Sequence, residues 1–126
     1  MYFVKINQNK EEQMTVLVIA KDPEKMKEVR KAVLEALQDR GNCCTVSHED
    51  GLDIFVRLQP DLIIVCDYDE EVTRPTKMAY SSGFRSYCRI KEFVSEHRMI
   101  RMGDKEFRHV NYCNSEISLK ELVCMH

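Results

Sequence analysis

The sequence predicts an α/β domain built on a parallel sheet. Residues 15–20 and 62–66 are unbroken apolar runs of strand length, and a helical period follows the first of them. Strands that are covered on both faces carry such continuous runs, whereas strands with one wet face alternate between apolar and polar residues. Strand and helix periods then alternate along most of the chain, which is typical of parallel α/β domains.

The first predicted helix follows the strand at 15–20 directly. Asp22 is expected to cap it, and Pro23 suits the first turn, where a missing N–H costs nothing. Gly41 is expected to end it. Its apolar positions, which recur at helical spacing, are Met26, Val29, Val33, Leu34 and Leu37.

Two short elements precede the strand at 62–66. Residues 44–47 are expected to form the second strand. Residues 52–58 are expected to form the second helix, with Ile54, Phe55 and Leu58 facing inward.

The pattern is interrupted after the third strand. Residues 67–82 are polar and include Pro75, which predicts a long loop. Helical periodicity resumes over 83–94, and residues 98–102 and 109–113 are predicted as the fourth and fifth strands.

The sequence also predicts the length of the fourth crossover and the start of the last helix. Residues 103–108 are too few for a full crossover helix, so the fourth crossover is expected to be shortened. The last helix is expected to begin at Ser118, the N-cap, with Glu121 at the capping-box position.

This order of elements predicts a flavodoxin-like, three-layer sandwich with a five-stranded parallel sheet of order 2-1-3-4-5. In such a sheet the loops after the first and third strands meet at the switch point, where ligands bind. The residues expected beside one another there are Lys21, Asp22, Cys66, Asp67 and Met102.

Composition limits the class of protein. The chain of 126 residues, 44% hydrophobic and 32% charged, is expected to form one soluble domain over 14–126, preceded by an extension over 1–13. Within the extension, residues 2–6 are a candidate edge strand. A net charge of -2 argues against nucleic-acid binding. The absence of a membrane-length apolar run and of a signal-peptide pattern predicts a cytoplasmic protein without a membrane partner.

The six cysteines include no C-x-x-C pair, so neither a metal site nor a cofactor is predicted. Without a secretory signal, disulfides are not expected either. The favoured interpretation is that the thiols act as small hydrophobic residues. Redox sensing through Cys66 or the Cys43-Cys44 pair is the alternative.

Four segments resemble the receiver domains of response regulators. They are residues 16–24, Asp50-Gly51, residues 60–66 and residues 118–123, in the family's order and spacing. In that family, two carboxylates after the first strand hold Mg²⁺, and an aspartate that ends the third strand accepts phosphate. The resemblance therefore implies a signalling role and the same fold.

The residues that would carry phosphotransfer are replaced. Ala20 and Lys21 stand at the two carboxylate positions, and Cys66 stands at the acceptor position, one residue before Asp67. Met102 occupies the position of the hydroxyl residue, and Ser115-Glu116 replaces the family's Lys-Pro pair. Lys21 is interpreted either as a solvated turn residue or as an internal counter-ion for Asp22 or Asp67.

These departures predict a regulatory protein that is not an enzyme, is not phosphorylated and binds a protein partner or a second copy of itself in bacterial signal transduction. A flavodoxin-like protein that binds a nucleotide or another small molecule is the alternative, although no glycine-rich loop follows the first strand. The shortened crossover places the expected interaction face beside the fifth strand and the last helix. Its expected apolar anchors are Phe107, Val110, Tyr112 and Leu122.

Overall fold

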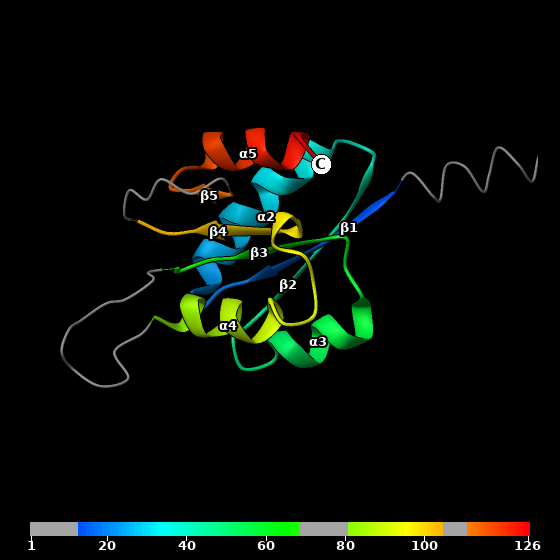
Figure 1. Ribbon diagram of the computed structural model, residues 1–126. Helices are drawn as coiled ribbons and strands as arrows, with labels where there is room; N and C mark the ends of the chain where they lie inside the picture. The colour runs from blue at the N-terminus through cyan, green and yellow to red at the C-terminus, as the bar shows by residue number, and fades with distance from the viewer. Residues whose placement is uncertain (1–12, 69–80, 105–110) are drawn as a thin grey trace, which may run out of the picture.

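The computed structural model describes residues 13–68, 81–104 and 111–126, in which strands and helices alternate (Figure 1). Phe107, Val110 and the candidate strand at 2–6 lie outside the described residues. In chain order the elements are β1 (Met14–Ile19), α2 (Pro23–Leu37), β2 (Gly41–Val46), α3 (Gly51–Leu58), β3 (Leu62–Val65), α4 (Ser82–Ile90), the 3-10 helix η1 (Glu96–Arg98), β4 (Met99–Met102), β5 (Tyr112–Cys113) and α5 (Glu116–Cys124).

The five strands form one all-parallel sheet in the order β2-β1-β3-β4-β5, which confirms the predicted strand order. β1 lies between β2 and β3 and forms the longest pairings of the sheet. Met14 of β1 lies beside Gly41 of β2, and Val16 of β1 lies beside Leu62 of β3. This arrangement is compatible with a flavodoxin-like fold.

Helices cover both faces of the sheet, in three layers (Figure 1). Successive residues of each strand point to opposite faces, so every strand contributes to two cores. Val16 and Val18 of β1 pack with α2 and α5, whereas Leu17 and Ile19 pack on the side of α3 and α4. This double burial is the reason that β1 and β3 are continuous apolar runs.

The start of α2 forms as predicted. The Asp22 carboxylate accepts a hydrogen bond from the amide of Glu24 at 3.1 Å, and Pro23 occupies the first turn. The end differs from the prediction. α2 stops at Leu37, Gln38 adopts a φ of 57°, and Gly41 belongs to β2.

Two further predictions are wrong. Leu58 was expected to face inward but is 37% exposed, because α3 is short and ends at once in the left-handed residue Gln59. Ser118 is not the N-cap of α5. Ser115 holds that position, and its hydroxyl accepts a hydrogen bond from the amide of Ser118 at 3.1 Å.

The connection from β4 to β5 is short, as predicted. Only residues 103–111 lie between Met102 and Tyr112, although the two strands are parallel neighbours. Among the described residues, no helix has the length and apolarity needed to span a membrane.

Candidate functional site

The switch point lies where β1 and β3 end side by side. The amide of Cys66 donates to the carbonyl of Ile19 at 2.8 Å, and the amide of Ala20 donates to the carbonyl of Val46 at 3.1 Å. Ala20 and Cys66 are both fully buried against the α2 and α5 side, while Lys21 lies exposed at the turn. Neither of the two buried residues offers an oxygen ligand from its side chain.

Asp67 is the carboxylate of this region, and its backbone turns sharply. Its φ is 59°, a left-handed value that aspartate tolerates better than most residues. The turn directs the carboxylate back to β1, where Oδ2 accepts a hydrogen bond from the main-chain amide of Lys21 at 2.9 Å. It is therefore the amide of Lys21, rather than its ammonium group, that makes this contact with Asp67.

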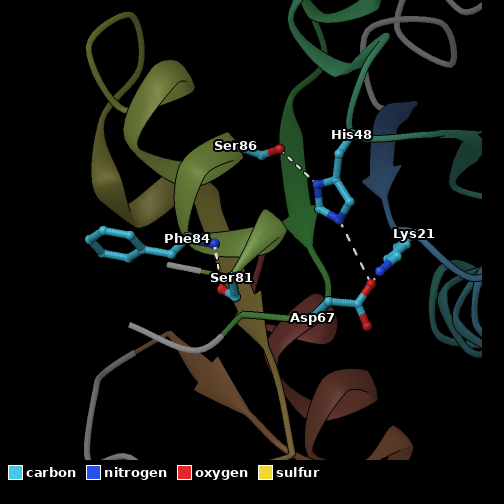
Figure 2. A network of polar contacts seen from close by, with 6 residues as sticks. All are labelled: Lys21, His48, Asp67, Ser81, Phe84 and Ser86. Carbon is cyan, nitrogen blue, oxygen red and sulfur yellow. Dashed lines mark hydrogen bonds and ion pairs between the residues drawn. The ribbon is translucent and has the colours of Figure 1, made fainter. Parts of the chain in front are cut away.

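His48, from the loop after β2, is the second neighbour of Asp67. Its Nε2 lies 3.7 Å from Oδ2 of Asp67, which is too long for a hydrogen bond but close enough for an ion pair when the imidazole is protonated (Figure 2). The His48 imidazole lowers the pKa of the Asp67 carboxyl, and the Lys21 amide acts in the same direction, while partial burial opposes both.

His48 also contacts Ser86 of α4. Nδ1 of the imidazole and Oγ of Ser86 are 2.7 Å apart, so His48 bridges α4 and the end of β3 (Figure 2). The order serine, histidine, aspartate resembles a hydrolase triad, but Ser86 is only 5% exposed in the middle of a helix. A substrate carbonyl cannot reach that hydroxyl, so the arrangement does not support nucleophilic catalysis.

The first turn of α4 fills the space beside the end of β3. A Cβ atom placed on Gly83 would lie 2.6 Å from the carbonyl carbon of Asp67. Ser81 caps this helix, because its hydroxyl accepts a hydrogen bond from the amide of Phe84 at 3.0 Å (Figure 2). Only glycine allows α4 to approach the backbone of the switch point so closely.

The other residues that were predicted to line the switch-point pocket cap helices or pack in the core. Asp22 caps α2, as described above, and Ser115 caps α5. Met102 is 2% exposed, packs on the α2 and α5 side, and accepts a hydrogen bond from the amide of Tyr68 through its carbonyl. The structure thus brings Ala20, Lys21, Cys66 and Asp67 together.

The buried thiols are poorly suited to redox chemistry. Burial is the main cause that raises the pKa of Cys66, and it also raises the pKa of Cys43 to about 11 and of Cys113 to about 12. Attack on an oxidant requires the thiolate, which these pKa values disfavour at neutral pH. Within the described residues, no group of three or more His, Cys, Asp or Glu side chains could hold a metal ion.

The described anchors of the predicted interaction face contribute to the core. Tyr112 is 9% exposed, and its ring centroid lies 6.1 Å from that of Tyr68. Leu122 is half-buried and packs against the core between the sheet, α2 and α5.

Sequence reasoning missed a buried cation on the α3 and α4 side. Arg101 of β4 is 7% exposed, and its guanidinium carbon lies 5.1 Å from the ring centroid of Tyr87 and 5.7 Å from that of Tyr68. Its charge is paired with the Glu96 carboxylate, 3.4 Å away, which also accepts a hydrogen bond from the Tyr87 hydroxyl. The apolar neighbours Ile100 and Met102 predict a buried strand, but they do not predict that Arg101 is buried with it.

A groove of about 390 Å³ lies at the opposite end of the sheet, away from Asp67. Pro60, before β3, and Arg98, before β4, contribute to its walls. Its lining residues are Phe55, Val56, Gln59, Pro60, Val94 and Arg98.

Compared with known proteins, the chain matches no family model, no curated protein and no solved structure. The likeness to receivers therefore rests on the residues of the chain and on its strand order.

Proposed function

We propose that this chain is a receiver-like regulatory domain of flavodoxin-like fold that is not phosphorylated on aspartate. On this proposal it acts by binding another protein in bacterial signal transduction. The observation that supports it best is the chemistry of the switch point. The residue at the acceptor position is a fully buried cysteine, and the neighbouring carboxylate is bound by the Lys21 amide and lies beside His48.

Phosphotransfer to aspartate needs a free carboxylate and a Mg²⁺ ion with octahedral oxygen ligands. Ala20 cannot supply such a ligand, and Lys21 adds a positive charge at the second position. Asp67 stands one residue after the acceptor position, and its Oδ2 is already engaged by the Lys21 amide. A site of this kind favours one resting conformation over a phosphorylation cycle.

The proposed lack of aspartyl phosphorylation is tested by incubation with acetyl phosphate and Mg²⁺, followed by intact-mass measurement. We expect no phosphoryl adduct, while an authentic receiver in the same reaction becomes modified. A hydroxylamine-labile adduct on Asp67 would refute the proposal. In a companion variant, Lys21→Asp with Cys66→Asp, restored phosphorylation would show that the fold is competent and that these two positions abolish the reaction.

The proposed binding of another protein is tested by recovering partners from the native cell on the immobilised chain. We expect a protein that is released by excess soluble chain and is not retained by a chain denatured before coupling. Recovery of no such protein would count against an interaction module, whatever the outcome of the phosphorylation assay.

A further inference from the structure

Apolar side chains are exposed around the groove that lies between the end of α3 and the segment before β4. Val56 of α3 lines this groove and is 57% exposed. Phe93 is 63% exposed, and its ring centroid lies 6.2 Å from that of Phe55, another lining residue. Among the described residues, the other large apolar side chains that are more than half exposed, Ile117 and Met125, lie at the two ends of α5. Exposed apolar side chains thus gather at the groove, and surfaces of this kind commonly mark binding sites.

The described part of the chain begins beside this groove. The amide of Thr15, the second residue of β1, donates to the Asp61 carboxylate at 2.8 Å, and the amide of Asp61 donates to the carbonyl of Thr15 at 2.8 Å. Asp61 follows Pro60, which forms part of the groove wall. Arg98, which also lines the groove, donates to the carbonyls of Pro60 and Asp61 at 2.6 and 3.1 Å. Hydrogen bonds therefore connect the walls of the groove to the start of β1.

Residues 1–12, which lie outside the described part of the chain, join an apolar segment to a polar tether. Residues 2–6, Tyr-Phe-Val-Lys-Ile, are apolar or aromatic except for the lysine, whereas residues 7–13 are all polar. The tether from Ile6 to Met14 can span up to about 26–29 Å, at 3.3–3.6 Å per residue. This reach exceeds the span to the groove, because Thr15 is hydrogen-bonded to the residue that follows Pro60. A short tether also holds the segment at a local concentration on the order of millimolar.

We propose that residues 2–6 bind in this groove within the same chain. Phe3 is the main anchor, because it has the largest purely apolar side chain of the segment and the gain from binding grows with the apolar area that is buried. Lys5 can cover apolar surface with its stem and keep its ammonium group in water. A protein partner would reach the groove only after displacing the segment. This inference does not rest on the proposed function, since it holds whether or not the domain is receiver-like.

The first test uses NMR spectra of the full chain, recorded with reductant. We expect nuclear Overhauser contacts between the Phe3 ring and the methyl groups of Val56 and Val94. Phe3→Asp should shift both valine methyl resonances, whereas Asn7→Asp, which makes a negative charge in the tether, should leave them unchanged. The amide resonances of β1 and β3 should stay in place in both variants, which would show that the domain remains folded.

The second test measures how well the segment shields the groove. Val56→Cys in the full chain places a thiol in the groove, and its labelling rate is followed by peptide mass spectrometry. Adding Phe3→Asp should make this labelling at least about tenfold faster, the factor that corresponds to a loss of about 1.4 kcal/mol of apolar burial. Adding Asn7→Asp should not change the rate. A peptide of residues 1–8 should slow the labelling of the Phe3→Asp chain again, and a peptide that itself carries Phe3→Asp should not.

Isotope labelling separates the other occupants of the groove. In an equal mixture of labelled and unlabelled chain, Overhauser contacts between the two kinds of chain would mean that a second copy fills the groove. Contacts from Phe3 to β2 in place of Val56 would mean that the segment covers the edge of the sheet. Either result would overturn the proposal, and so would a labelling rate at position 56 that Phe3→Asp leaves unchanged.

Discussion

Nδ1 of His48 and Oγ of Ser86 lie 2.7 Å apart, and this contact joins the loop after β2 to the middle of α4. The same imidazole faces Asp67 through Nε2. One side chain thus connects three segments that are far apart in sequence, and it does so beside the end of β3.

The contact between His48 and Ser86 predicts coupled mutational effects. His48→Ala leaves the buried Ser86 hydroxyl without this partner, so it should destabilise the fold by about 1–2 kcal/mol. The double variant with Ser86→Ala should lose less than the sum of the two single losses. Denaturant unfolding of all four proteins measures the coupling, and strict additivity would show that the contact contributes nothing.

The pKa of Asp67 provides a second prediction. A folded pKa below the unfolded value of about 3.9 means that the contacts of Asp67 stabilise the protein fully above that pH. This stabilisation is lost as the pH falls through the folded pKa. Because the imidazole is the largest cause, His48→Ala should move the Asp67 titration upward in a carboxyl-carbon NMR experiment.

Asp67→Asn tests the same linkage through stability. Asparagine also tolerates the left-handed backbone, so the variant should fold. The difference in unfolding free energy between wild type and Asp67→Asn should be largest above about pH 5 and should shrink as the pH falls below about 4. A difference that is constant with pH would mean that the carboxylate charge plays no part.

Gly83→Ala should destabilise the protein even though alanine favours helices. The added Cβ would lie 2.6 Å from the backbone of Asp67, so α4 must shift or the turn after β3 must open. We expect a loss of about 1–3 kcal/mol in thermal or denaturant unfolding. Arg89→Ala, at an exposed position of the same helix, serves as the control and should change stability by less than about 0.5 kcal/mol.

The sheet could be predicted from the sequence because its central strands carry a strong signal. Burial on both faces makes β1 and β3 continuous apolar runs, and the predicted ranges differ from the observed ones by one residue at the ends. The site could be predicted only in part. Ala20 and Cys66 follow from strand alignment, but the left-handed backbone of Asp67 and its approach to His48 depend on tertiary contacts.

The start of α5 shows why local patterns mislead. Ser118 with Glu121 matches the capping box, and this local match predicts that the helix begins at Ser118. The structure uses Ser115, since β5 ends at Cys113 and the helix must begin almost at once. Both serines are compatible with the local sequence, and the length of the preceding strand decides between them.

This choice of cap is itself testable. Ser115→Ala should destabilise the protein by about 1 kcal/mol, because the amide of Ser118 loses its acceptor. Ser118→Ala keeps that amide and its bond to Ser115, so it should cost clearly less. Equal losses in unfolding experiments would show that the two hydroxyls, 3.0 Å apart, act as one unit.

The buried guanidinium of Arg101 gives the last prediction. Within the part of the chain that the structure describes, its Nε has no hydrogen-bond partner, and its charge is balanced by Glu96, which is itself largely exposed. Glu96→Gln should therefore cost about 1–3 kcal/mol, because it leaves a desolvated cation beside the rings of Tyr68 and Tyr87. Arg101→Met removes the charge together with its desolvation penalty and keeps much of the side-chain volume, so it should cost less than Glu96→Gln does. In the double variant, the effect of Glu96→Gln should largely disappear. Glu96→Gln could instead lower the unfolding free energy by the same amount with methionine as with arginine at position 101. That result would show that Glu96 stabilises the protein through the hydrogen bond that it accepts from Tyr87 and not through the ion pair.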